Sequence, residues 1–155
     1  MGRVSGRVLL GTGIALGFFI IDRIGKWLAV HELSPDGLFL FPGIAGITLR
    51  ENSGIAYGIA IPPTILMSLV IGLIIFCVGA AVACHHRGSI RPLIPLMLIV
   101  AGACSNLLDR FVYGAVVDWL VLTSWPVFNI ADAMIAAGAV WLGILIVRQK
   151  KTHGY

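Results

Sequence analysis

Residues 63–83 read PTILMSLVIGLIIFCVGAAVA, and they lie inside a longer stretch, residues 52–86, that contains no Asp, Glu, Lys or Arg. An apolar run of about 20 residues is long enough to cross the hydrocarbon core of a bilayer as a helix. The whole chain has the same character, since 59% of its 155 residues are hydrophobic and only 12% are charged. A soluble domain of this size needs more charge to cover its surface. The sequence therefore predicts an integral membrane protein.

Three further segments have the length and composition of membrane spans. The expected spans cover residues 8–30, 63–83, 92–113 and 129–147. They predict an all-α membrane protein, a bundle of four transmembrane helices in one integral membrane domain over residues 1–155. In the first span, Gly13 and Gly17 have the small-xxx-small spacing that favours close packing of membrane helices.

The basic residues mark one side of the predicted bundle. Those at the chain ends and in the short central loop are Arg3, Arg7, Arg87, Arg91, Arg148, Lys150 and Lys151. All seven acids lie in the other loops or in the span ends next to them. Because Lys and Arg concentrate in cytoplasmic segments, we expect both termini in the cytoplasm. Bases placed in this way, without interleaved aromatic residues, also argue against a nucleic-acid partner despite the net charge of +4.

The outer loop at residues 31–61 has a pattern of its own. Apolar residues alternate with small or polar residues on both sides of Asn52-Ser53-Gly54, which is typical of a hairpin turn. We therefore expect a small β-like subdomain on the outer surface of the membrane.

Metal and disulfide motifs are missing from the sequence. Cys77, Cys84 and Cys104 are odd in number and show no CxxC spacing, so we interpret them as small core residues. There is no HExxH motif, and His85 and His86 are adjacent in the inner loop, which is the wrong spacing for a peptidase zinc site. We expect no metal and no cofactor.

Polar side chains that enter the spans are candidate functional residues, because a charge at the bilayer centre costs about 2.5–3.5 kcal/mol on insertion scales. Asp22 and Lys26 are four residues apart and can pair on one helix face. Asn106, Asp109 and Arg110 also share a face, where they can form a hydrogen-bonded strip. Both groups could instead be structural: an interfacial ion pair, and a network that holds the spans together.

Two other carboxylates have no base close to them in the sequence. Asp118 lies in AVVDWL and Asp132 in FNIADAMIAAG, at the mouths of two spans. Taken singly, Asp118 could be a solvated loop acid, and Asp132 could complete a helix cap that starts at Asn129. As a crowded pair they would share one proton, so that one donates while the other acts as a base. The pair indicates an aspartyl hydrolase, without the DTG or DSG triplet of pepsin-like enzymes.

Two other classes of protein remain open at this point. A small proton-coupled transporter would use the same aspartates as a proton relay, and it predicts inverted repeats that the sequence does not show. A non-enzymatic membrane adaptor would use its buried polar residues only to hold helices together. The adaptor would tolerate Asp118→Asn and Asp132→Asn without a specific catalytic defect.

Five motifs follow one another along the chain: DRIGK at residues 22–26, ENSGIAYG at 51–58, GACSNLLDR at 102–110, VVDW at 116–119 and FNIAD at 128–132. In this order they resemble the motifs of the bacterial lipoprotein signal peptidase (signal peptidase II) family. The resemblance implies an intramembrane aspartyl endopeptidase with Asp118 and Asp132 as its catalytic dyad. Its substrate would be a diacylglyceryl-modified prolipoprotein, cleaved before the lipidated cysteine.

The same resemblance implies roles for the remaining polar residues. The substrate-binding residues would be Asn52, Gly54, Asn106, Arg110 and Asn129. Supporting residues would be Asp22, Lys26 and Asp109. We also expect a monomer in the bacterial cytoplasmic (inner) membrane, with membrane lipid as a second partner and the active site near the outer face.

The chain departs from the family pattern at five positions beside these residues. Arg23 and Gly25 stand where Gln and Ser or Thr are more usual, and Ser105 stands where a Gly usually precedes the Asn. Tyr57 and Trp119 replace Phe. All five lie beside the residues assigned to the site, so the class of protein does not depend on them.

Overall fold

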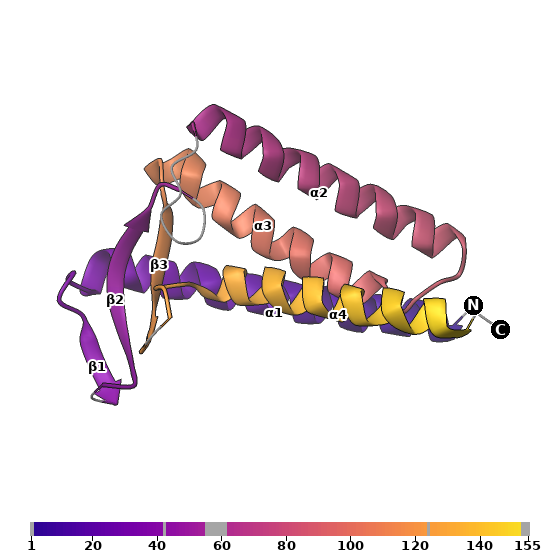
Figure 1. Ribbon diagram of the computed structural model, residues 1–155, viewed down its shortest axis with the longest axis horizontal. Coiled ribbons are helices and arrows are strands. Elements are labelled where there is room, and N and C mark those ends of the chain that lie inside the picture. Colours follow the sequence, from indigo (N-terminus) through magenta and orange to yellow (C-terminus); the bar gives the residue numbers. More distant parts are fainter. Residues whose placement is uncertain (1, 42, 55–61, 124, 153–155) are drawn as a thin grey trace.

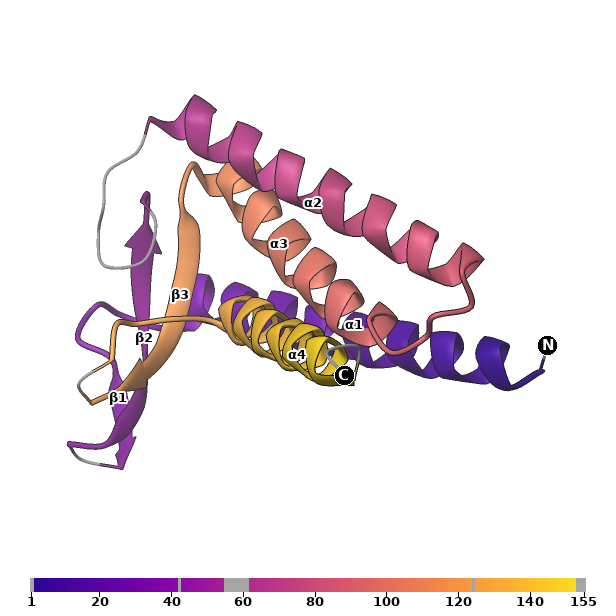
Figure 2. The same cartoon turned by 45° about the vertical axis from the view of Figure 1, so that its right-hand side comes forward.

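The computed structural model describes residues 2–41, 43–54, 62–123 and 125–152. Within these ranges the chain forms four long helices and three strands (Figure 1). In chain order they are α1 (Gly2–Glu32), β1 (Leu38–Phe41), β2 (Ala45–Asn52), α2 (Pro63–His86), α3 (Leu93–Tyr113), β3 (Val116–Leu122) and α4 (Ile130–Thr152). The start of α1 and the end of α4 lie at the end of the bundle opposite to the sheet (Figures 1 and 2).

All four helices are long and apolar enough to cross a membrane. The candidate spans are Val8–Glu32, Pro63–His86, Leu93–Tyr113 and Ile130–Gln149. Large apolar side chains cover their outer faces, for example Leu9, Phe76 and Val140, which are 75%, 72% and 63% exposed. Such faces are expected where the surrounding solvent is lipid. The prediction of a four-helix membrane protein with a small sheet is confirmed.

Local chemistry explains where two of these helices begin and end. Pro63 occupies the first turn of α2, where a missing N–H leaves no bond unmade. Helix α3 ends at Gly114, which takes a left-handed φ of 78° and donates its N–H to the carbonyl of Arg110 at 3.1 Å. This sharp end turns the chain directly into β3.

Helix α3 is the centre of the bundle and packs against α1, α2 and α4. A Cβ added at Gly102 would lie 2.5 Å from the carbonyl oxygen of Ala131, so α3 and α4 are in backbone contact there. Gly13 and Gly17 have nothing within 4 Å of an added Cβ. The prediction that these two glycines pack against another helix is therefore wrong, because their side of α1 faces open space.

The strands form one antiparallel sheet in the order β1-β2-β3, and they run across the direction of the helices (Figure 1). The chain reverses between β1 and β2, where Ile44 N–H donates to the carbonyl of Phe41 at 2.9 Å. The sequence predicts a hairpin turn at residues 52–54, but the hairpin within the described residues is the one between β1 and β2, and Asn52 is the last residue of β2; residues 55–61 lie outside the described residues. On its other side, β2 pairs with β3, with Arg50 opposite Asp118.

Two small apolar clusters fill the interior away from the sheet. One contains Cys77 with Leu96 and Ile99, so the interpretation of this cysteine as a core residue is confirmed. Cys84 and Cys104 are half-buried, and all three thiols are free.

Candidate active site

Asp118 and Asp132 are linked through a single amide side chain. Asp118 lies in β3 and Asp132 in the first turn of α4. Asn129 Nδ2 donates to Asp118 Oδ1 at 2.6 Å, and the backbone N–H of Asp132 donates to Asn129 Oδ1 at 2.8 Å. The structure therefore places Asp118 and Asp132 in one site.

The link is built from a helix cap. The backbone N–H of Asn129 donates to Asp132 Oδ2 at 3.4 Å, which completes a reciprocal capping box with the bond from Asp132 N–H. The predicted cap is thus present, and it does not compete with the pairing of the acids. The cap fixes the orientation of the Asp132 side chain at the start of α4. The NH₂ group of Asn129, which the cap does not use, donates to Asp118.

Asp118 is buried, with 1% of its surface exposed, so its interpretation as a solvated loop acid is wrong. Asn52 Nδ2, at the end of β2, donates to Asp118 Oδ2 at 3.0 Å. Burial, and next the charge of Asp132, raise the pKa of Asp118 from 3.8 to about 6, although Asn52, Asn129 and Lys26 act in the opposite direction. The carboxyl group thus titrates close to neutral pH.

Asp132 is held from the opposite side by α3. Asn106 Nδ2 donates to Asp132 Oδ1 at 2.7 Å, and Lys26 Nζ donates to Asn106 Oδ1 at 2.7 Å. The lysine therefore fixes which way the amide of Asn106 points, so that its NH₂ group faces the carboxylate.

Below the two acids lies a cluster of buried charges. Lys26 Nζ is 3.0 Å from Asp22 Oδ2 and 2.7 Å from Asp109 Oδ2, and all three side chains are 0% exposed. The predicted pair of Asp22 and Lys26 is confirmed. The predicted strip on α3 is only partly formed, because Asp109 pairs with Lys26 and Arg23 of α1 rather than with its neighbour Arg110.

Arg110 connects α3 to the end of β2. Its Nη2 donates to the carbonyl of Gly54 at 3.2 Å, and its Nη1 lies 3.5 Å from the carbonyl of Asn106. The Nε atom of Arg110 is buried and has no hydrogen-bond partner among the described residues. Gly54 N–H in turn donates to Asn52 Oδ1 at 3.1 Å, so Gly54 is tied both to Asn52 of β2 and to Arg110 of α3.

Four of the five departures from the family pattern meet in pairs. Arg23 Nη1 donates to Ser105 Oγ at 3.4 Å as well as pairing with Asp109. A Cβ added at Gly25 would lie 2.3 Å from the ring of Trp119, so the larger aromatic residue fits because the helix carries no side chain there. The motifs taken one by one do not predict these two contacts; the signal that could have revealed them is that both residues of each pair depart from the family pattern. Tyr57 lies outside the described residues.

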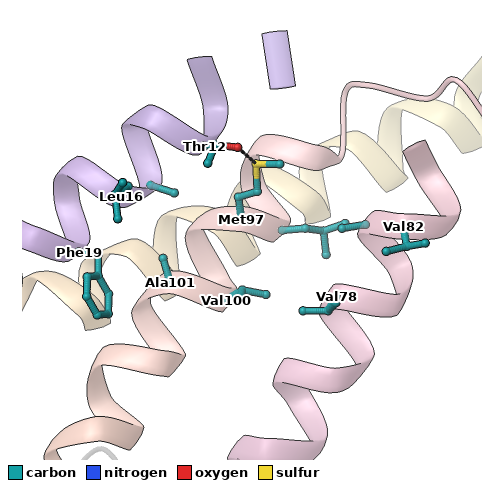
Figure 3. Close-up of a pocket in the computed structure, with 11 residues that line it drawn as sticks. Thr12, Leu16, Phe19, Val78, Val82, Met97, Val100 and Ala101 are labelled. Carbon is teal, nitrogen blue, oxygen red and sulfur yellow. Dashed lines mark hydrogen bonds between the residues drawn. The ribbon is translucent and has the colours of Figure 1, made fainter. Parts of the chain in front are cut away.

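An apolar cavity of about 390 Å³ lies elsewhere in the bundle (Figure 3). It opens between α1, α2 and α3, with Phe19, Val82 and Ala101 among its lining residues. Ala101 and Asn106 are five residues apart on α3, which places them about 140° apart around the helix. The cavity is therefore not part of the carboxylate site.

Fold and site together define a multi-pass membrane protein with two linked acids at one end of a four-helix bundle. A family profile described as Signal peptidase (SPase) II matches residues 14–148, and the chain belongs to this family.

Relatives and solved structures agree with this assignment. The chain is 36% identical over 135 residues to a protein named lipoprotein signal peptidase from Syntrophomonas wolfei, with 85% of this chain and 89% of the relative covered. It is 35% identical to one of the same name from Chlorobium phaeovibrioides, with 83% and 84% covered. A solved structure described as a bacterial membrane enzyme superposes with a TM-score of 0.79 at 25% identity, and covers 96% of this chain and 92% of its own.

Proposed function

We propose that this protein is an aspartyl endopeptidase that removes the signal peptide from diacylglyceryl-modified prolipoproteins, cutting before the lipidated cysteine. Family membership supports the peptidase and its prolipoprotein substrate over a transporter or an adaptor. The observation that carries the aspartyl mechanism is the link of Asp118 and Asp132 through Asn129. No other pair of carboxylates among the described residues is free of a salt bridge and joined in this way.

The proposed chemistry divides the work between the two acids. The ionised carboxylate takes a proton from water, and the water oxygen attacks the carbonyl carbon of the scissile peptide bond. The protonated acid donates its proton to the carbonyl oxygen, and the tetrahedral intermediate then collapses as a proton passes to the leaving amine. A pKa of about 6 for Asp118 suits this exchange, since proton transfer is most effective when the pKa lies near the working pH.

The surrounding polar groups would bind the peptide backbone. We assign this role to Asn52, Gly54, Asn106, Arg110 and Asn129. Arg110 is the clearest candidate, because its buried Nε has no partner among the described residues and could donate to a substrate carbonyl. Its bond to Gly54 would also hold this residue next to the bound peptide.

We further infer the orientation of the chain in the bacterial inner membrane. Both termini would lie in the cytoplasm and the site near the outer face. Support comes from the basic residues of the chain ends and of the α2–α3 loop, together with a sheet that lies at the opposite end of the bundle (Figure 2). The chain would act as one integral membrane domain and as a monomer, with its substrate entering sideways from the lipid.

Cleavage by the purified protein tests the proposal. A diacylglyceryl-modified prolipoprotein should be cut once, and mass spectrometry should find the lipidated cysteine at the new N-terminus. The same prolipoprotein without the lipid is the matched control and should be cut more slowly. A cut at another bond, or no cut by folded protein, would contradict the proposal.

A further inference from the structure

The residue directly before each acid of the pair donates its backbone N–H to a buried carboxylate. Asp109 Oδ2 accepts a hydrogen bond from the backbone N–H of Val117 at 3.2 Å, and Val117 precedes Asp118. Asp22 Oδ1 accepts one from the backbone N–H of Ala131 at 2.9 Å, and Ala131 precedes Asp132. The two carboxylates belong to different helices, yet each holds the equivalent backbone atom.

Lys26 joins these two carboxylates. An ammonium group has three N–H donors, and the structure gives each of them an acceptor. Two go to Asp22 and Asp109 at 3.0 and 2.7 Å, and the third goes to Asn106 at 2.7 Å. Since Asn106 in turn donates to Asp132, every donor of Lys26 acts on a group that holds the pair in place.

From this geometry we propose that Asp22, Lys26 and Asp109 form a clamp that sets the separation and orientation of Asp118 and Asp132. The inference rests on the proposed catalytic role of that pair. The clamp residues do not touch the reacting atoms and act as positioning residues.

The chemistry of the bonds suits a rigid clamp. Ala131 N–H is one of the first amides of α4, which lack a partner within the helix and lie at the positive end of its dipole. A carboxylate acceptor there makes a shorter and stronger bond than a neutral one. With Arg23 paired to Asp109, the cluster contains two acids and two bases, so it adds no net charge beneath the site.

The two carboxylates differ in how many bonds each oxygen makes, and this difference gives the test. In Asp109, one oxygen holds both Val117 N–H and Lys26, while the other faces only Arg23. An Asn at this position can keep both clamp bonds with its single oxygen, provided that its NH₂ group finds an acceptor. Arg23→Gln would supply that acceptor.

An Asn cannot replace Asp22 in the same way. One of its oxygens holds Ala131 N–H, and the other holds Lys26 and the hydroxyl of Ser105 at 2.6 Å. An Asn at this position has one acceptor oxygen, so it must give up either the bond from Ala131 N–H or the bond from Lys26. The clamp therefore predicts that Asp22→Asn cannot be rescued by Arg23→Gln, whereas Asp109→Asn can.

The experiment measures kcat and KM for prolipoprotein cleavage, with folding checked by thermal unfolding. Because misplaced reacting groups can lose about 100-fold in rate, we expect Asp109→Ala and Asp22→Asn to lower kcat by about that factor, with KM within about threefold of the parent. Asp109→Asn/Arg23→Gln should recover kcat to within about fivefold of the parent. Backbone exchange measured by NMR should show faster exchange of Val117 N–H in Asp109→Ala and not in the double variant.

The outcomes separate this inference from the proposed function. If folded Asp118→Asn and Asp132→Asn cleave like the parent, the proposed function fails. If those variants are inactive while Asp109→Ala or Asp22→Asn keeps the parental kcat, the function stands and the clamp is overturned. If one clamp variant does not fold, the remaining one decides. A kcat that only follows the loss of thermal stability, without rescue in the double variant, also overturns the clamp.

Discussion

The two ends of the helix bundle are held together by different interactions. At the end that carries the sheet, α1 and α3 meet through Asp22, Lys26 and Asp109, which are fully buried. Toward the other end, the bundle packs through an apolar cluster that includes Ala15 and Leu98. Apolar packing tolerates substitution when volume is kept, whereas a buried charge that loses its partner is strongly destabilising. The positions of the side chains are therefore most tightly constrained at the end of the bundle that carries Asp118 and Asp132.

Among changes to glycine contacts and the apolar cavity, the largest effect is expected where α3 and α4 are in backbone contact near the site. Gly102→Ala would bring a Cβ to 2.5 Å from the carbonyl oxygen of Ala131, so α4 must move together with Asp132. We expect a loss of about 1–3 kcal/mol in unfolding free energy from overpacking. Cleavage should fall by about 100-fold as Asp132 is displaced.

Gly13→Ala is the matched control for this substitution. An added Cβ at Gly13 meets nothing within 4 Å, so this variant should be slightly more stable, by about 0.5–1 kcal/mol, with unchanged cleavage. Equal effects of the two alanines on thermal unfolding and cleavage would refute the contrast between the two positions.

A smaller effect is expected where α1 touches β3. Gly25→Ala would place a Cβ 2.3 Å from the ring of Trp119, which is adjacent to Asp118 in the strand. Since the ring can move more easily than a backbone, we expect about a tenfold loss of kcat. Trp119→Phe in the same chain should restore most of it, because the smaller ring leaves room for the methyl group. No recovery in the double variant would show that the contact does not explain the loss.

The free energy of unfolding should depend on pH because of Asp118. Its pKa of about 6 in the folded chain exceeds the ordinary value of 3.8, so the folded state binds the proton more tightly. The resulting contribution to stability is fully present below about pH 4 and is lost as the pH rises through about 6. As the pH rises between these values, the midpoint temperature of unfolding of the parent should therefore fall relative to that of Asp118→Asn. A constant difference across this range would contradict the raised pKa.

The smallest effect is expected in the apolar cavity. Ala101→Leu adds apolar volume to a space of about 390 Å³ and touches none of the polar network. Cleavage should stay within about twofold of the parent. The control is Ala131→Leu, the same substitution at a fully buried position next to Asp132, which should abolish most activity. A comparable loss in Ala101→Leu would place the cavity on the path of the substrate.

The sequence predicted the membrane helices well because a span is specified locally, by length and composition. The same holds for the ion pair of Asp22 and Lys26, whose spacing of four residues brings them together in any helix. The cap at Asn129 is also a local pattern, which the sequence offers as an alternative to a role of Asp132 in an acid pair. The structure contains both arrangements in the same residues.

Contacts between distant segments could not be predicted from local patterns. The pairing of β2 with β3 brings Asn52 to Asp118 across 66 residues, and no local alternation reveals such a partner. Arg23 likewise forms an ion pair with Asp109, which lies on another helix. The glycines show the same limit: small-xxx-small spacing suggested Gly13 and Gly17, but contact depends on which face of α1 meets a neighbour.

If Asp118 and Asp132 act as one catalytic unit, the double variant should be no slower than the single variants. Cleavage of the lipid-modified prolipoprotein would be measured for Asp118→Asn, Asp132→Asn and the double variant, each shown to be folded. Residues that act as a unit are not additive, so we predict that the double variant is no slower than either single one, at about 1,000-fold or more below the parent. Losses that multiply in the double variant would show that the two acids act independently, and parental cleavage by either single variant would remove that acid from catalysis.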